Sequence, residues 1–322
     1  MTVSYTTNSP SISVVVPVYN SEDSLPELVN RLESTLCAAS SRFEVILVND
    51  GSRDRSWDVI SQVAQDNDWV HGIDLMRNYG QHNALLCGIR MAKNDIIVTV
   101  DDDLQNPPEE IPKLLDKLAE GYDVVYGTPQ KERHGLWRNL ASLVTKSALR
   151  TAMGGQTARK VSAFRVFRTD LRDAFANYQS PFISIDVLLT WGTTRFASIP
   201  VRYELRGVGA SNYTFLKLVT HALNMMTGFS TWPLQLASVI GFLFTFLGML
   251  ILAYVIIRYL IEGGSVPGFA FLASIIAIFS GAQLFALGII GEYLARMHFR
   301  SMGRPPSIIR MTTGVPSEHQ GD

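Results

Sequence analysis

Residues 96–105 read Ile-Ile-Val-Thr-Val-Asp-Asp-Asp-Leu-Gln, so a short apolar strand-like run leads directly into three adjacent carboxylates. Neighbouring carboxylates repel one another and are costly to remove from water, so they favour a solvated loop or a bound cation. Mg²⁺ and Mn²⁺ prefer oxygen ligands and share them with substrate phosphates, so the triplet predicts a metal site for a phosphorylated ligand. The alternative is a surface turn before a helix that begins near Pro107 and Pro108.

Around this stretch, the first 130 residues alternate between Val- and Ile-rich runs and amphipathic helical patterns. Strands are expected at 13–18, 43–49, 70–75, 95–100 and 122–127, and helices at 24–39, 56–66, 82–93 and 108–120. This alternation predicts an α/β fold with a mostly parallel sheet that is covered on both faces. Ligands of such sheets bind at the carboxyl ends of the strands.

Polar groups follow three of the expected strands, at 17–20, at 49–52 and in the acidic triplet. Asp50 is expected to accept hydrogen bonds from a base or ribose, whereas Asp101 and Asp103 are expected near the ribose and a metal-bound diphosphate. Taken alone, 49–52 also fits a tight turn before a helix N-cap. No dinucleotide or P-loop glycine pattern follows these strands, which argues against an oxidoreductase or a P-loop enzyme.

The last third of the chain holds two long uncharged runs, from Leu234 to Ile257 and from Gly263 to Gly291. At a rise of ~1.5 Å per residue, the first run is roughly 36 Å long as a helix, enough to cross a hydrocarbon core of about 30 Å. The short connection between the runs predicts an antiparallel transmembrane hairpin. The alternative is two buried core helices, although soluble helices of this length usually have a polar face.

Charge predicts the orientation of the hairpin. The connection at 262–268 carries no Lys or Arg, whereas Arg296, Arg300, Arg304 and Arg310 follow the second run. The positive-inside rule therefore places the C-terminal tail and the N-terminal domain in the cytoplasm, as parts of a multi-pass inner-membrane protein. The polar first ten residues contain no apolar signal segment, so secretion of the N-terminal domain is not expected.

Composition excludes other classes. The net charge of −1 argues against nucleic acid as the main partner. Two cysteines in the whole chain do not make a disulfide framework or a cysteine-rich metal site. A chain of 322 residues with 47% hydrophobic content allows one large domain or two.

Five ordered motifs together resemble those of the polyprenyl-phosphate glycosyltransferases, the group of dolichyl-phosphate mannose synthase and of bacterial enzymes that load sugars onto undecaprenyl phosphate. The motifs lie at 17–20, 49–52, 77–82, 101–109 and 206–213. The resemblance spans about residue 12 to residue 300. It implies a GT-A type, Rossmann-like domain that performs an inverting sugar transfer, followed by the helix hairpin of the bacterial members.

The organisation expected on this basis has four parts. They are a cytoplasmic GT-A domain at 1–210, an interfacial amphipathic helix at 211–232, a transmembrane hairpin at 233–297 and a cytoplasmic tail at 298–322. Apolar residues recur at three- and four-residue intervals between 215 and 229, as in a helix lying along a membrane surface. A second such pattern at 136–149 fits either an interfacial helix or ordinary core packing.

For the donor, the resemblance implies residue roles by motif position. Pro17, Tyr19 and Asp50 would hold the nucleoside, and Asp101 would contact it near the ribose. Asp103 and Gln105 would coordinate Mg²⁺ or Mn²⁺ on the diphosphate. Arg77 would either shape the nucleotide pocket or pair with an acidic neighbour.

For the acceptor, the resemblance implies that Arg206 and Ser211 contact the phosphate, with Asp103 and Arg206 as the catalytic residues. A polyprenyl phosphate is anionic near neutral pH because its second pKa is about 6, so it needs less help from a base than a sugar hydroxyl would. Attack from the face opposite the leaving group inverts the anomeric carbon in one step.

The sequence departs from the family pattern at three places. The run 159–165 lacks the Asp that relatives often have beside the Phe-Arg element, Asn212 replaces a usual Lys, and Ser21 replaces a usual Glu. Asp170 and Asp186 lie nearby, and the sequence does not choose between them as a catalytic base.

The expected function is transfer of a sugar from a nucleotide sugar to a polyprenyl phosphate at the cytoplasmic membrane face. The residue sequence at 78–82 resembles that of bacterial members that use UDP-sugars, so a UDP-sugar donor is expected. Undecaprenyl phosphate is the expected acceptor. Because bacterial relatives with this hairpin tend to form tetramers, a homotetramer is expected. One alternative is a transferase that uses another lipid or a glycan acceptor. A second, motivated by the three departures, is a catalytically silent membrane scaffold.

Overall fold

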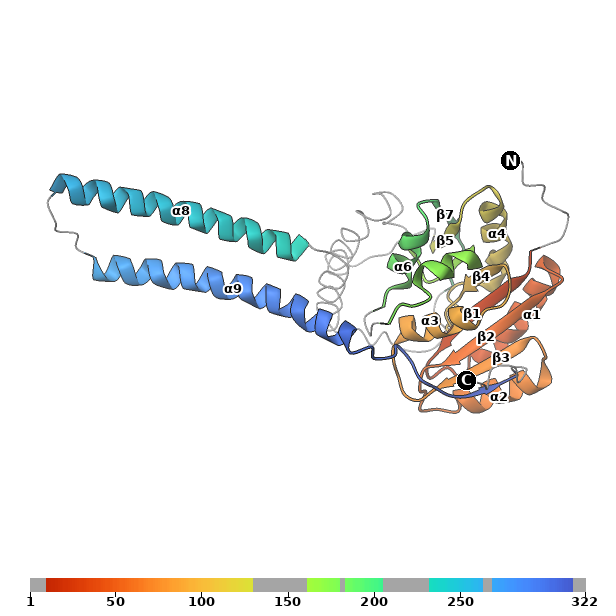
Figure 1. The fold of residues 1–322 in the computed structure, drawn as a ribbon. Coiled ribbons are helices and arrows are strands. Elements are labelled where there is room, and N and C mark those ends of the chain that lie inside the picture. The colour runs from red at the N-terminus through yellow and green to blue at the C-terminus, as the bar shows by residue number, and fades with distance from the viewer. Residues whose placement is uncertain (1–9, 130–160, 180–182, 205–231, 263–267, 315–322) are drawn as a thin grey trace. The chain divides into compact units, whose positions relative to one another are not determined.

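The computed structural model describes residues 10–129, 161–179, 183–204, 232–262 and 268–314. The chain divides into two compact units, one formed by Met1–Tyr213 with Gly303–Asp322 and the other by Thr214–Met302. The first unit is built on a β-sheet and the second on two long helices (Figure 1).

Within the described residues, the first unit contains an eight-stranded sheet in the order β7-β5-β6-β4-β1-β2-β3-β8. The strands are β1 (Ile12–Val18), β2 (Phe43–Asn49), β3 (Val70–Leu75), β4 (Ile96–Thr99), β5 (Val124–Pro129), β6 (Arg165–Arg168), β7 (Phe196–Val201) and β8 (Ile309–Thr313). The pairs β1–β2, β1–β4, β2–β3 and β5–β7 are parallel, whereas β4–β6, β5–β6 and β3–β8 are antiparallel. The predicted α/β fold is confirmed, and the sheet contains both parallel and antiparallel pairs.

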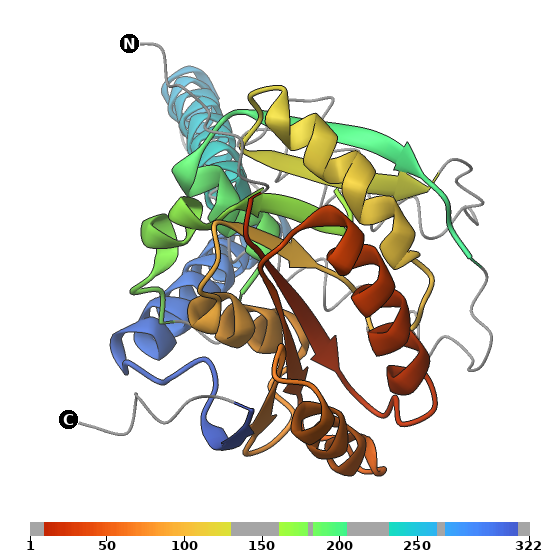
Figure 2. The same cartoon turned by 90° about the vertical axis from the view of Figure 1, so that its right-hand side faces the viewer.

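Helices cover both faces of this sheet (Figure 2). They are α1 (Leu25–Ala39), α2 (Ser56–Asp66), α3 (Gln81–Met91), α4 (Ile111–Ala119) and α6 (Ile185–Gly192), with 3₁₀ turns η1 (Pro108–Glu110) and η3 (Thr169–Phe175). On α1, Leu25, Leu28, Leu32 and Leu36 recur at helical spacing and are buried in the core shared by β1 and β2. On the other face, α3 lies so close to the sheet that Gly88 is in contact distance of Val15 and Val48.

The expected helix at 108–120 divides into two elements. Pro108–Glu110 forms the 3₁₀ turn η1, and α4 begins at Ile111 with Pro112 in its first turn. A proline inside an α-helix clashes with the carbonyl four residues earlier and donates no hydrogen bond, so the α-helix begins at this point.

The segment expected as a C-terminal tail returns to the first unit and adds the strand β8 to the edge of β3. The Met76 N–H donates to the Ile308 carbonyl at 2.9 Å. The Arg310 guanidinium lies 3.4 Å from the buried Asp74 carboxylate, which accepts a 2.7 Å hydrogen bond from the Asn49 amide at the end of β2. This pairing covers the edge of a core strand, where unpaired backbone groups would otherwise be exposed.

The second unit contains α8 (Trp232–Glu262) and α9 (Phe269–Ser301), which lie side by side (Figure 1). The rings of Phe244 and Phe279 meet edge to face at 5.7 Å between centroids. The segments Leu234–Arg258 and Ile278–His298 are long and apolar enough to cross a membrane. The two amphipathic patterns expected at 136–149 and 215–229 lie outside the described residues.

The close approach of α3 to the sheet predicts that Gly88→Ala is destabilising. The added Cβ would lie 2.4 Å from the Val15 Cγ1 atom and 3.0 Å from the Val48 Cγ2 atom, so the helix must move away. We expect a loss of about 1–3 kcal/mol of unfolding free energy, which thermal unfolding of the purified protein would measure.

The matched control is Gly281→Ala on α9, where no described atom lies within 4 Å of the new Cβ. This control should leave the unfolding midpoint unchanged or raise it slightly. Equal midpoints for the wild type and Gly88→Ala would contradict the proposed packing.

Candidate functional site

The acidic triplet follows β4 at the carboxyl edge of the sheet, and its middle residue is bound to the loop after β1. The Asp102 carboxylate accepts the Tyr19 N–H at 3.0 Å and the Ser21 hydroxyl at 2.5 Å. The Ser24 hydroxyl donates to the Asp102 carbonyl at 2.7 Å. Asp102 therefore anchors the loop after β1 to the loop after β4.

One of these contacts is made by Ser21, which departs from the family pattern. Ser21 donates to the Asp102 carboxylate, whereas a Glu at position 21 would bring a second negative charge to the same place. In this chain, Ser21 therefore stabilises the negative charge of Asp102 instead of adding to it.

Asp50, at the end of β2, is 3% exposed and holds the segment that leads into α3. Its two carboxylate oxygens accept the Tyr79 N–H at 2.7 Å and the Gly80 N–H at 2.8 Å. Burial raises the pKa of the Asp50 carboxyl, and the two backbone hydrogen bonds act against that rise. Gly51 has φ +66°, and a Cβ there would lie 2.5 Å from the backbone nitrogen of Asn78. The motif at 49–52 thus packs directly on the motif at 77–82.

The first residue of α3 completes the connection between these motifs and the triplet. The Gln81 amide donates to the Asp101 carboxylate at 2.6 Å. Beside it, the Arg77 guanidinium lies 4.6 Å from the centre of the Tyr79 ring, a cation–π contact. Three motifs that are far apart in the sequence therefore meet at one edge of the sheet.

The negative charge of the triplet is incompletely compensated. The pKa of Asp101 is raised to about 7, chiefly by burial and further by the charges of Asp103 and Asp102, whereas Arg165 and the Gln81 hydrogen bond act in the opposite direction. A divalent cation beside these carboxylates would relieve the repulsion between them.

The donor set fits a metal ion that is shared with a substrate. Asp103 accepts the Gln105 N–H at 3.1 Å, and the Gln105 side-chain oxygen accepts the Tyr203 hydroxyl. The described part of the chain contains no group of three or more His, Cys, Asp or Glu side chains that could hold a metal ion. Mg²⁺ typically takes one or two carboxylates from the protein and its remaining ligands from phosphates and water, which fits the oxygens present here.

The structure places the predicted site residues as follows. Tyr19 is 43% exposed on the carboxyl edge, near Asp102, and Asp101, Asp103 and Gln105 lie on the same edge. Asp50 is linked to them through the 77–81 segment, because it accepts the Tyr79 N–H while Gln81 donates to Asp101. Pro17 is buried in β1 and pairs with Val48 of β2. Arg206 and Ser211 lie outside the described residues.

A buried ion pair behind the triplet has no counterpart in the predicted site. Arg165 is 1% exposed, pairs with Thr99 in the β4–β6 register and donates to the Thr99 hydroxyl at 3.0 Å. Its guanidinium also binds the carboxylate of Asp186 on α6, which accepts the Tyr126 hydroxyl at 3.1 Å. Asp186 supplies an acidic partner for the Phe-Arg element, and only the tertiary structure distinguishes it from Asp170.

The chain is similar to known proteins in sequence and in fold. The model of the family described as Glycosyl transferase family 2 matches residues 13–175. An undecaprenyl-phosphate 4-deoxy-4-formamido-L-arabinose transferase of Proteus mirabilis is 36% identical over 315 residues, covering 96% of both chains. The Pseudomonas paraeruginosa protein of the same name is 35% identical over 95% of this chain and 91% of its own length.

Among solved structures, glucosyl-3-phosphoglycerate synthase from Mycobacterium tuberculosis, in complex with phosphoglyceric acid, has a similar fold. The match has a TM-score of 0.51 and 18% identity, and it covers 68% of this chain and 79% of that chain.

The double acceptance by Asp50 predicts that Asp50→Asn is destabilising. An amide has one acceptor oxygen, so either the Tyr79 or the Gly80 N–H would lose its buried partner. We expect a loss of about 1–3 kcal/mol of unfolding free energy, measured by thermal unfolding. Asp58→Asn, on the exposed face of α2, is the control and should shift stability by less than about 0.5 kcal/mol. Equal effects of the two substitutions would contradict the role of Asp50.

The buried pair predicts that Asp186→Asn acts mainly on stability. It leaves the Arg165 guanidinium buried without a counter-ion, which we expect to cost about 3–5 kcal/mol of unfolding free energy. Replacing both members, Arg165→Met with Asp186→Leu, should recover most of that loss. A stable Asp186→Asn variant without turnover would instead identify Asp186 as a catalytic base.

Proposed function

Because the chain belongs to glycosyl transferase family 2, and within it to the polyprenyl-phosphate glycosyltransferases, we propose that it transfers a sugar from a nucleotide sugar to a polyprenyl phosphate. The observation that carries this proposal is that four family motifs, 17–20, 49–52, 77–82 and 101–109, meet at the acidic edge of the sheet. The names of the relatives support undecaprenyl phosphate as the acceptor.

The donor is proposed to bind at the carboxyl ends of β1, β2 and β4 as a UDP-sugar. Tyr19 follows β1, which contains Pro17, and is proposed to border the nucleoside. Asp50 holds the 77–80 segment, which is proposed to form one side of the nucleoside-binding site. Asp101 lies at the ribose end, held by Gln81. Asp103 and Gln105 would hold Mg²⁺ or Mn²⁺ together with the diphosphate.

In this proposal, a metal ion held by Asp103 and Gln105 would supply positive charge to the leaving diphosphate. Asp102 keeps the loop after β1 in place beside that diphosphate through Tyr19 and Ser21. Arg206 and Ser211 are proposed to orient the acceptor phosphate, whose oxygen attacks the anomeric carbon from the opposite face and inverts it.

The proposed chemistry needs no protein base. The acceptor phosphate is already anionic near neutral pH, given a second pKa of about 6. The carboxylate of Asp186 is occupied by Arg165 and Tyr126, which fits a positioning rather than a proton-accepting role.

The membrane part of the proposal rests on α8 and α9. Both helices are long and apolar enough to span a bilayer, so we propose a multi-pass inner-membrane protein with its catalytic domain in the cytoplasm. An isoprenoid acceptor would stay in the bilayer while only its phosphate reaches the active site. The proposed assembly is a homo-oligomer, with a tetramer as the form that the family resemblance implies.

A transfer assay tests the proposal. Purified protein, undecaprenyl phosphate and a panel of radiolabelled UDP- and GDP-sugars should yield label in the lipid phase with Mn²⁺ or Mg²⁺, and chelation should abolish it. Asp103→Asn should lower kcat by about 100-fold or more, since the leaving diphosphate loses its main charge stabilisation. Asp58→Asn is the control.

Transfer of label to another lipid or to a glycan, but not to undecaprenyl phosphate, would favour the alternative of a transferase with a different acceptor. Absence of transfer with every donor would favour the silent scaffold, and full activity of Asp103→Asn would contradict the assigned metal ligand.

A further inference from the structure

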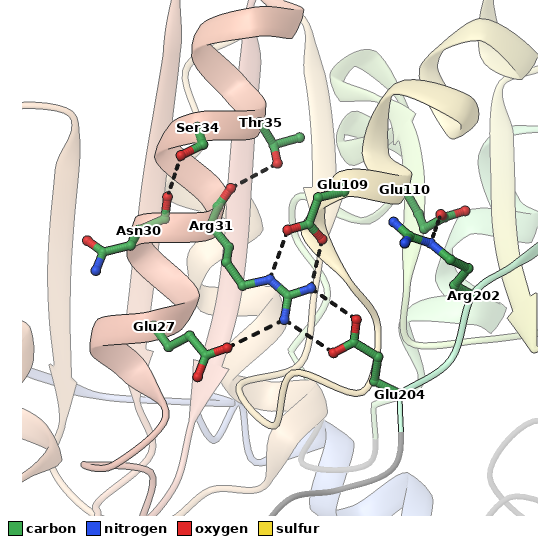
Figure 3. A network of polar contacts seen from close by, with 9 residues as sticks. All are labelled: Glu27, Asn30, Arg31, Ser34, Thr35, Glu109, Glu110, Arg202 and Glu204. Atoms are coloured by element: carbon green, nitrogen blue, oxygen red, sulfur yellow. Dashed lines mark hydrogen bonds and ion pairs between the residues drawn. The ribbon is translucent and has the colours of Figure 1, made fainter.

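Arg31 on α1 lies between the carboxylates of Glu109 and Glu204, which are far apart in the sequence of the first unit (Figure 3). Its Nε and Nη2 atoms donate to the two oxygens of Glu109 at 2.9 and 2.8 Å. Its Nη1 and Nη2 atoms also donate to the two oxygens of Glu204 at 3.3 and 3.2 Å. We refer to Arg31, Glu109 and Glu204 as the carboxylate clamp.

The clamp joins two segments that have different roles in the proposed reaction. Glu109 lies in η1, directly after the loop that carries the triplet and Gln105, on the donor side. Glu204 lies two residues before Arg206, which is proposed to contact the acceptor phosphate. The single guanidinium of Arg31 therefore lies where the donor loop and the acceptor segment meet.

Further contacts connect the same two segments residue by residue. The Glu204 N–H donates to the Gln105 carbonyl at 2.9 Å, and the Tyr203 hydroxyl donates to the Gln105 side-chain oxygen. Arg202 donates to the buried Glu110 carboxylate at 2.7 Å. Each of the three residues from 202 to 204 thus contacts the loop at 105–110.

Electrostatics makes Arg31 the component on which the clamp depends. Glu109 and Glu204 would repel one another without the cation between them, and the third nearby carboxylate, Glu27, lies 3.6 Å from Arg31. The hydrogen bonds from Arg31 hold the pKa of Glu109 below its ordinary value. The Arg31 side chain is 21% exposed, so solvent screens these bidentate contacts less than those of a fully exposed pair.

We propose that Arg31 is a positioning residue that holds the acceptor segment on the metal-binding loop, so that acceptor phosphate and donor diphosphate are aligned for transfer. This inference rests on the proposed function. Arg31 affects the reaction only indirectly, through its contacts with Glu109 and Glu204. It contacts neither Asp101 nor Asp103. Replacing Arg31 should therefore impair the alignment of the acceptor phosphate more than the binding of the donor nucleotide.

The first experiment is independent of turnover. Hydrogen exchange of the full-length protein, followed by mass spectrometry, should show faster exchange in peptides covering 105–110 and 202–204 for Arg31→Gln, by about fivefold or more. Adding Glu204→Gln to the same protein removes the repulsion with Glu109 and should bring exchange back toward the wild type. Unchanged exchange in Arg31→Gln would overturn the proposal whether or not the protein is a transferase.

The second experiment separates positioning from general stabilisation. In the transfer assay, Arg31→Gln should lower kcat/KM for undecaprenyl phosphate by about tenfold or more, as expected for misaligned reactants. The dissociation constant for UDP with Mn²⁺, measured by calorimetry, should stay within about twofold of the wild type. The double variant Arg31→Gln with Glu204→Gln should recover most of the lost kcat/KM.

The matched control is Glu27→Gln, which removes another carboxylate near the Arg31 guanidinium, one that belongs to neither segment. This substitution should change neither the hydrogen exchange of the two segments nor kcat/KM for the acceptor. Equal losses of UDP affinity and acceptor kcat/KM in Arg31→Gln, or no recovery in the double variant, would overturn the positioning role. Absence of transfer in the wild type would instead refute the proposed function, while the exchange experiment would still decide whether the clamp exists.

Discussion

Three consecutive carboxylates at the end of a buried strand cannot be neutralised by their own neighbours in the sequence, and the site is organised around that constraint. Each carboxylate has a different partner. Asp102 accepts hydrogen bonds from the loop after β1, Asp101 from Gln81, and Asp103 from the Gln105 backbone. The charge that these contacts leave uncompensated is what makes the edge of the sheet suitable for a cation and a diphosphate.

The loops around the triplet are held mainly by carboxylates that accept backbone N–H groups. Asp50 holds the 77–80 segment in this way, and Asp102 holds Tyr19. Because these acceptors are buried or partly buried, the loops keep defined positions although they lie outside the regular strands. A nucleotide sugar would therefore meet a largely preformed edge, which lowers the cost of ordering the protein on binding.

Two arginines outside the triplet place the remaining parts of the site. Arg165, behind the sheet edge, is buried with Asp186 and Tyr126 and contributes positive potential near Asp101. Arg31 connects Glu109, which follows the triplet in the sequence, to Glu204, which precedes the proposed acceptor-binding motif. Each arginine needs nearby carboxylates to balance its charge: Asp186 for Arg165, and Glu109 and Glu204 for Arg31. A loop movement that separated these pairs would be costly, so the pairs also restrict how the loops can rearrange.

The sequence by itself determined the alternation of strands and helices in the first 130 residues and the two long apolar helices, because both follow from local periodicity. It also placed Tyr19, Asp101 and Gln105 at strand ends. Only the tertiary structure decided that β8 joins β3, that Asp186 rather than Asp170 pairs with Arg165, and that Arg31 meets Glu204, 173 residues away. These contacts depend on distance in space, and no local pattern of residues records which distant segments the fold brings together.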